Sequence, residues 1–199
     1  ILNGNKQFLI PVYQRFYSWD IDQCKRLWND IVEMQRKGKA GHFVGSIVNI
    51  AEQAMPTGVQ KYMIIDGQQR MTTLTLLLLA LRDYAIKNLS DTTINARRID
   101  NMLLKNEYES GDERYKLLLT ETDRDILISL VEEKPIAEGT RSRLIENYSW
   151  SGISIQAFFI VCILLGYFAQ IYRQSEWTIK CKICLNVQSV FTVQNNHPT

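Results

Sequence analysis

Short runs of apolar residues in the first third of the chain have the pattern of β-strands. Residues 8–13 consist mainly of strand-forming side chains, and Pro11 favours an extended backbone before it. Residues 42–50 and 62–65 form two more such runs, separated by a segment whose prolines and glycines are typical of a turn. The pattern therefore predicts extended structure at these three places.

Helical spacing of apolar residues follows two of these runs. It begins after Asp20, which makes a capping pair with Gln23, and it continues until Gly38 ends the helix. A leucine-rich run from Thr72 to about Ile86 predicts a second helix that is mostly buried. We expect this second helix to form the centre of the core.

The second half of the chain has weaker signals. Residues 94–105 show helical spacing, and residues 115–119 predict a short strand or turn. Thr122 is expected to cap a helix over residues 123–133, and residues 141–148 begin another helical pattern.

Composition limits the class of protein. The chain has 199 residues, of which 46% are hydrophobic and 22% charged, which is typical of one folded domain with or without an appendage. A net charge of +2 gives no overall attraction to nucleic acid or membrane. Its four cysteines form no disulfide framework, so we expect a reducing, cytoplasmic location. The chain begins without methionine or a signal sequence, as expected for a piece of a longer reading frame.

The character of the sequence changes at Ser149, because no charged residue follows until Arg173. Three interpretations remain open. The native reading frame has been lost near Ser149, or residues 153–172 form a membrane anchor, since about 20 apolar residues cross a bilayer, or the segment is a pair of core helices. Contact with a membrane is expected only if the 153–172 segment is a genuine span.

Residues 66–70 contain polar chemistry at the point where a strand pattern gives way to a helix pattern. Such a junction directs free N–H groups and the positive end of the helix dipole at a small volume that suits an anion. We expect Arg70 and the hydroxyls of Thr72 and Thr73 in that volume, and Asp66 has the chemistry to bind a divalent metal or orient a water. The alternative is that Asp66 and Thr72 cap the helix while Arg70 forms a surface ion pair.

A second segment has similar chemistry, because Gln14 and Arg15 follow the first extended run. If both segments lie at one sheet edge, Arg15 and Arg70 converge on one pocket and favour a highly charged anion, such as nucleotide phosphate or a nucleic-acid backbone. The aromatic residues nearby either stack on a base or pack in the core. They are Tyr13, Phe16, Tyr17 and Trp19.

Three motifs, at residues 10–19, 42–47 and 65–74, resemble in sequence and order the N-terminal domain of GmrSD-type restriction proteins. The resemblance extends from residue 1 to about residue 148. It implies an α/β (α+β) fold of the ParB/sulfiredoxin-like superfamily, with a small mixed sheet, packed helices and a helical region after them. We therefore expect a core over residues 1–90, a helical extension of the same domain over 91–148, and an atypical hydrophobic tail over 149–199.

The same resemblance implies a function. It implies nucleotide binding or hydrolysis with a divalent metal, in bacterial defence against modified phage DNA, and we expect the ligand to be a nucleoside triphosphate with Mg²⁺ or a similar divalent cation. The matching positions imply catalytic roles for Asp66, Gln68, Gln69 and Arg70, with Asp66 as metal ligand. They imply nucleotide or phosphate binding by Tyr13, Gln14, Arg15, Gly67, Arg70, Thr72 and Thr73. They also imply that Trp19, His42 and Gly45 shape the pocket.

The expected partners are DNA, a nuclease domain or subunit, and a second copy of the chain. Family members often have an HNH nuclease motif, but the only histidines here are His42 and His197, so we do not expect this chain to cleave DNA alone. Two other functions stay open. One is a non-catalytic module that binds DNA or nucleotide, and the other is direct ParB-like nuclease activity.

Overall fold

The described part of the chain contains a four-stranded mixed sheet. The computed structural model describes residues 2–37, 45–52, 58–89 and 96–171, with the backbone alone for residues 35 and 161–171. The strand order is β2-β3-β1-β4, in which β3, β1 and β4 are parallel and β2 is antiparallel to β3. The strands are β1 (Lys6–Leu9), β2 (Val48–Ala51), β3 (Gln60–Asp66) and β4 (Leu117–Leu118).

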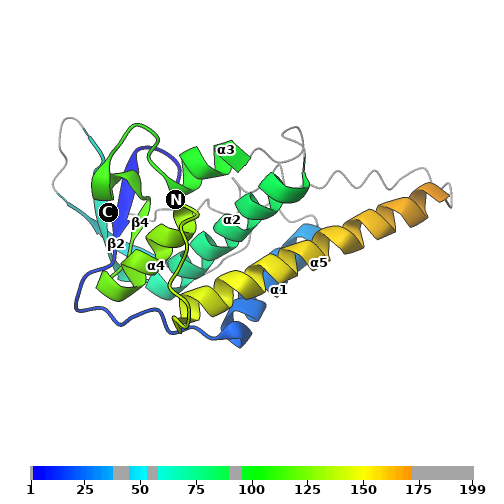
Figure 1. Cartoon of the computed structure of the whole chain (residues 1–199), viewed down its shortest axis with the longest axis horizontal. Helices are drawn as coiled ribbons and strands as arrows, with labels where there is room; N and C mark the ends of the chain where they lie inside the picture. The colour runs from blue at the N-terminus through cyan, green and yellow to red at the C-terminus, as the bar shows by residue number, and fades with distance from the viewer. Residues whose placement is uncertain (1, 38–44, 53–57, 90–95, 172–199) are drawn as a thin grey trace, which may run out of the picture.

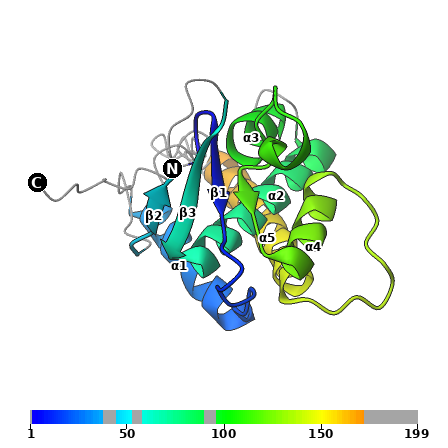
Figure 2. The ribbon, with the colours of Figure 1, turned by 90° about the vertical axis from the view of Figure 1, so that its left-hand side faces the viewer.

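Helices pack against this sheet, and Figure 2 shows α2 and α5 behind the strands. The helical elements are α1 (Ile21–Arg36), α2 (Gln68–Asn88), α3 (Ala96–Ile99), the π-helical turn η1 (Asp100–Leu104), the 3₁₀ turn η2 (Gly111–Arg114), α4 (Glu121–Val131) and α5 (Arg143–Ile171). A mixed sheet with packed helices confirms the predicted α/β fold.

The predicted capping pair at the start of α1 is confirmed. The N–H of Asp20 donates to Gln23 Oε1 at 2.7 Å, and the N–H of Gln23 donates to Asp20 Oδ1 at 3.1 Å. These reciprocal bonds satisfy donors that a helix start leaves free. The predicted end of this helix, Gly38, lies outside the described residues.

Several element boundaries differ from the prediction, and three of them lie close to the predicted motifs or to the sheet edge that these motifs follow. Strand β1 ends at Leu9 rather than at residue 13, and α4 begins after Thr120 rather than after Thr122. Helix α2 begins at Gln68 rather than Thr72. The early start of α2 depends on Gly67, whose φ of +93° turns the chain out of β3 without a Cβ penalty. A Cβ at Gly67 would lie 2.9 Å from Ile47 Cγ1, so a larger residue does not fit there.

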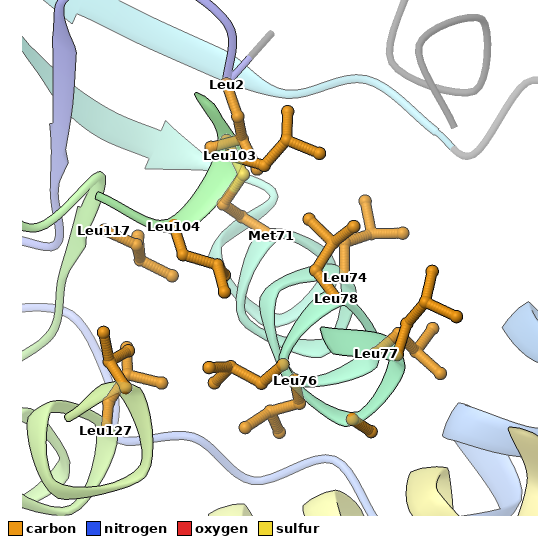
Figure 3. Close-up of a cluster of buried hydrophobic side chains, with 14 of the residues drawn as sticks. Leu2, Met71, Leu74, Leu76, Leu77, Leu78, Leu103, Leu104, Leu117 and Leu127 are labelled. Carbon is orange, nitrogen blue, oxygen red and sulfur yellow. The ribbon is translucent and has the colours of Figure 1, made fainter. Parts of the chain in front are cut away.

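Helix α2 forms the centre of the core, as predicted. Nearly all of its residues from Gln68 to Arg82 are buried, and Leu76 and Leu79 are fully covered. A helix that is covered on all sides needs neighbours around its whole circumference. The sheet, α4 and α5 supply them, and Figure 3 shows leucines of several elements gathered around α2.

Helix α5 passes through residue 149 without a break. Ile155 and Phe159 on this helix are buried, and the Phe159 ring stacks on Tyr84 of α2 with the ring centroids 4.8 Å apart. Residues 149–160 therefore contribute to the core. Of the helices in the described residues, none is both long enough and apolar enough to cross a membrane. Residues 172–199 lie outside the described residues.

Lys116, directly before β4, gives the fold a testable pH dependence. Its side chain is 3% exposed and donates to the backbone carbonyl of Gly4. Burial, with a smaller contribution from the charge of Lys6, lowers the Lys116 pKa from 10.5 to about 8. Between pH 8 and 10 the unfolded chain therefore binds more protons at this position than the folded chain, so folded stability rises with pH.

We expect the free energy of unfolding of the wild type, minus that of Lys116→Met, to increase from pH 8 to pH 10. Urea unfolding at each pH measures both values, and the subtraction removes the contributions of other groups that titrate in this range. Lys134→Met, at an exposed position, is the matched control. A difference that stays constant or falls for Lys116→Met would contradict the lowered pKa.

Candidate functional site

The carboxyl ends of three parallel strands meet at one edge of the sheet. Strand β1 leads into residues 10–19, β3 leads into the start of α2, and β4 leads through Thr120 into α4. Ligands of open α/β sheets bind outside the carboxyl ends of the parallel strands. Two of the predicted motifs, at residues 10–19 and 65–74, lie at this edge.

A small cavity lies at this edge, between the segment after β1 and the first turns of α2 and α4. Its volume is about 10 Å³, which is room for about one water molecule. The polar side chains that line it come from all three segments, and we refer to it as the edge cavity. They include Arg15, Gln68, Thr72, Thr120 and Asp123.

Most of these polar side chains are buried but have little bonding to the protein. Gln68, Thr72 and Thr120 are 8%, 2% and 6% exposed. Within the described residues, none of the three side chains makes a hydrogen bond to the protein. Buried polar groups are normally paired with protein or ordered water. The edge cavity therefore has free hydrogen-bonding capacity for a small polar ligand or water.

Asp123 is a site residue that the sequence reasoning missed. It lies in the first turn of α4, is 8% exposed, and its Oδ2 accepts the N–H of Tyr17 at 2.7 Å. Burial raises the pKa of the Asp123 carboxyl, while the hydrogen bond from Tyr17 opposes the shift. The sequence contained a signal for Asp123. Polar residues follow the predicted strand at residues 115–119 directly, as they do at the strand-to-helix junction at the start of α2.

Gln69 connects α2 to the segment after β1. Its Oε1 accepts the N–H groups of Ser18 at 2.8 Å and Trp19 at 3.2 Å, and its Nε2 donates to the Phe16 carbonyl at 3.1 Å. The side chain is 6% exposed. Because both ends of the amide are occupied by backbone groups, the geometry of Gln69 is that of an anchor for residues 16–19.

Thr73 contributes to the same anchor. Its hydroxyl donates to the Gln69 carbonyl and makes a 2.8 Å hydrogen bond with the Tyr17 hydroxyl. The side-chain amide of Asn147 on α5 donates to the Tyr17 hydroxyl at 3.0 Å and to the Trp19 carbonyl at 2.8 Å. Buried Tyr17 and half-buried Trp19 are therefore packing residues, which is the structural alternative that the sequence left open for the aromatics.

Arg70 lies on the side of α2 away from the edge cavity. Two residues correspond to about 200° of helix rotation, so Arg70 and Gln68 point to opposite sides. Arg70 Nη2 donates to the Ser46 carbonyl at 2.6 Å and pairs with Asp66 Oδ2 at 3.3 Å. The ion pair is the one expected in the alternative interpretation of Arg70. The helix cap expected from Asp66 and Thr72 in that interpretation is absent, because the N-cap residue is Gly67 and no side chain caps the helix.

Within the described residues, the edge cavity contains only one of the two arginines that the sequence predicts to share a pocket. Arg15 lines the edge cavity, whereas Arg70 contacts the segment before β2. A Cβ at Gly45, whose φ is +92°, would lie 2.7 Å from Arg70 Nη1, so this glycine allows the guanidinium to approach the backbone. Arg70 is not beside Gln68 in the edge cavity because the side chains of residues 68 and 70 point to opposite sides of α2.

The other predicted residues have various surroundings. Tyr13 is 69% exposed, and Gln14 Nε2 donates to the Ile65 carbonyl at 3.0 Å. Thr72 and Thr73 lie in the second turn of α2, so their own N–H groups are not free donors at the helix start. His42 lies outside the described residues. In the ranges that the structure describes, no group of three or more His, Cys, Asp or Glu side chains forms a metal site.

Comparison with known protein families gives a match over nearly the whole chain. A family model with the description "GmrSD restriction endonuclease, N-terminal domain" matches residues 1–196. The match extends past residue 148, to which the sequence motifs alone were traced. No match was found among curated proteins.

Proposed function

The chain belongs to the GmrSD restriction endonuclease N-terminal domain family, and we propose that it binds and hydrolyses a nucleoside triphosphate with Mg²⁺ or a similar divalent cation. It is a domain of a restriction system. In the proposed function, hydrolysis allows a nuclease domain or subunit to cleave DNA, and the target is modified phage DNA. The observation that supports this proposal is the edge cavity, where three polar side chains that make no hydrogen bond within the described residues lie near Arg15.

Arg15 has the chemistry of a phosphate ligand. Its side chain is exposed at the edge cavity, and its planar guanidinium donates two parallel hydrogen bonds to phosphate oxygens. The first turn of α2 begins at the same edge and contains no acidic residue, so its dipole favours an anion. A cavity of about 10 Å³ admits no nucleotide, so the phosphates bind at its mouth. Exposed Tyr13 and Phe16 are the proposed surface for the base.

The metal requirement fits the carboxylates at this edge. Mg²⁺ commonly keeps several waters and uses one or two carboxylates together with substrate phosphates. Asp66, at the end of β3, has an exposed carboxylate whose Oδ2 pairs at 3.3 Å with Arg70 Nη2, and its other oxygen has no partner among the described residues. Asp66 is the proposed ligand of a Mg²⁺ ion that arrives with the triphosphate. Because its partner Arg70 faces away from the edge cavity, the phosphates would extend from Arg15 past the start of α2 to reach this ion, which would neutralise their charge.

Phosphate release by the full chain with Mg²⁺ and each common nucleoside triphosphate, with and without DNA, tests the proposal. We expect Arg15→Ala to lower kcat/KM at least about 100-fold, since removal of one preorganised donor from a charged transition state has this effect. The thermal unfolding midpoint should stay unchanged because Arg15 is exposed. Arg97→Ala is the matched control, since Arg97 is exposed on α3 and is not among the residues that line the edge cavity.

Two results would contradict the proposal. A folded wild-type chain that neither binds nor hydrolyses any triphosphate would exclude the function. Equal turnover by wild type and Arg15→Ala would exclude Arg15 as the phosphate ligand. Binding without phosphate release would instead support a binding module, and its affinity for DNA would then fall steeply with salt if it contacts the DNA backbone.

A further inference from the structure

Asp123 has hydrogen-bonding capacity that the fold does not use. The residue lines the edge cavity, and in the described part of the chain its side chain has one partner, the N–H of Tyr17 at Oδ2. A carboxylate has about four acceptor sites. The single bond from Tyr17 fixes the orientation of the Asp123 carboxylate and leaves most of its acceptor capacity free.

The cavity beside Asp123 has the size and lining of a site for one water. Its volume of about 10 Å³ is close to the space that one water molecule needs. A buried water makes two to four hydrogen bonds, and Gln68, Thr72, Thr120 and Asp123 provide a donor or acceptor each. Each of the four side chains is more than nine-tenths buried. Arg15 is the exposed cationic residue among those that line the same space.

We propose that the edge cavity holds the water that attacks the terminal phosphorus of the triphosphate, and that Asp123 orients this water. This inference rests on the proposed function. As the water oxygen bonds to phosphorus, its proton passes to the Asp123 carboxylate, and the bond between phosphorus and the bridging oxygen breaks. The products are a nucleoside diphosphate and inorganic phosphate, and Asp123 then returns the proton to solvent.

The charges around Asp123 suit this role. The titratable groups that line the cavity with it are Arg15 and Tyr17. Burial raises the pKa of Tyr17, so its hydroxyl stays neutral, and a guanidinium stays charged at any assay pH. The raised pKa of Asp123 brings the carboxylate closer to the operating pH, which favours a base. An acid limb in the pH profile of kcat is therefore assigned to Asp123.

The test compares Asp123→Asn with Asp125→Asn in the full chain. Asp125 is exposed two residues further along α4, so it receives the same chemical change outside the cavity. We expect Asp123→Asn to lower kcat at least about 100-fold, the usual contribution of a positioned base. Its Kd for a non-hydrolysable triphosphate with Mg²⁺ should stay equal or fall, because a negative charge near the phosphates is removed. Asparagine still offers an oxygen to the N–H of Tyr17, so the unfolding midpoint should change little.

A second variant gives a readout that a structural role would not change. Asp123→Glu retains a carboxylate, so it should recover part of the activity and shift the acid limb of kcat. Turnover by Asp123→Asn within threefold of wild type would overturn the inference while leaving the proposed function intact, and so would a parallel loss of affinity and kcat. If the wild type neither binds nor hydrolyses a triphosphate, the proposed function fails, and this inference fails with it.

Discussion

Replacement of Arg82 by alanine is expected to lower the free energy of unfolding by about 3–5 kcal/mol, as is usual when one partner of a buried ion pair is removed. The Arg82 side chain is 2% exposed. Its Nε pairs with Asp83 at 2.7 Å, and its Nη1 donates to Asp100 at 2.9 Å and to the Val131 carbonyl at 2.8 Å. Nη2 donates to the Leu130 carbonyl at 3.3 Å. Alanine leaves all of these groups without the cation.

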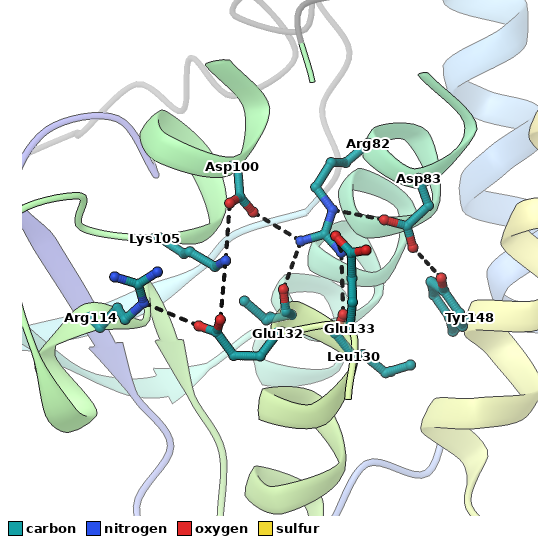
Figure 4. A network of polar contacts seen from close by, with 10 residues as sticks. Arg82, Asp83, Asp100, Lys105, Arg114, Leu130, Glu132, Glu133 and Tyr148 are labelled. Carbon is teal, nitrogen blue, oxygen red and sulfur yellow. Dashed lines mark hydrogen bonds and ion pairs between the residues drawn. The ribbon is translucent and has the colours of Figure 1, made fainter. Parts of the chain in front are cut away.

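The stability of the fold depends strongly on Arg82 because this side chain connects several helical elements. The carbonyls of Leu130 and Val131 belong to the last turn of α4, where a cation complements the helix dipole. The hydroxyl of Tyr148 on α5 donates to Asp83, and Lys105 pairs with Asp100 at 3.0 Å. Figure 4 shows that this network joins residues of α2, η1, α4 and α5. Arg82 therefore positions the helix whose other end contains Asp123.

Thermal and urea unfolding of Arg82→Ala measure the effect. For a chain of this size, the expected loss corresponds to a fall in Tm of about 10 °C. Arg97→Ala, on the exposed side of α3, should change the stability by less than about 0.5 kcal/mol, as surface substitutions usually do. A fall in Tm below about 2 °C for Arg82→Ala would show that the network contributes little.

Replacing each of the two neighbouring glutamines at the start of α2 by leucine should affect the stability of the fold very differently. Gln69→Leu removes the partner of the Ser18 and Trp19 N–H groups and of the Phe16 carbonyl. The three backbone groups are partly buried, so each should cost about 1 kcal/mol, the lower end for an unpaired group, and we expect a loss of about 3 kcal/mol in stability. Gln68→Leu removes no hydrogen bond within the described residues, so its stability should change by less than about 1 kcal/mol.

Urea unfolding of the two variants and phosphate release by each are the measurements. Under the proposed function, Gln68→Leu loses turnover while it stays folded, because leucine cannot bond to a water in the edge cavity. Gln69→Leu should lose stability first and release residues 16–19 to proteolysis. Equal stability of the two variants would contradict the anchoring role of Gln69, and full turnover by Gln68→Leu would exclude Gln68 from the water site.

The elements that could be predicted from the sequence are those with strong local causes. The reciprocal bonds of Asp20 and Gln23 at the start of α1 depend on residues three apart, and the buried state of α2 follows from its leucines. The start of α2 was predicted four residues late because the polar run at residues 68–70 reads as a loop. A buried glutamine in a first helical turn is stabilised only by backbone groups far away in the sequence, which no local pattern indicates.

The sequence by itself determined the family, the α/β class and the junction at residues 66–70, because these depend on motifs and on local periodicity. Only the tertiary structure decided which polar residues share a site. Asp123 and Thr120 join Arg15 and Gln68 because β4 pairs with β1, and this pairing spans more than 100 residues of chain. Arg70 faces away from the edge cavity because α2 turns by about 200° between residues 68 and 70. Long-range contacts between packed elements decide which side chains face the same cavity. The set of residues in the site therefore follows from the fold and not from local sequence.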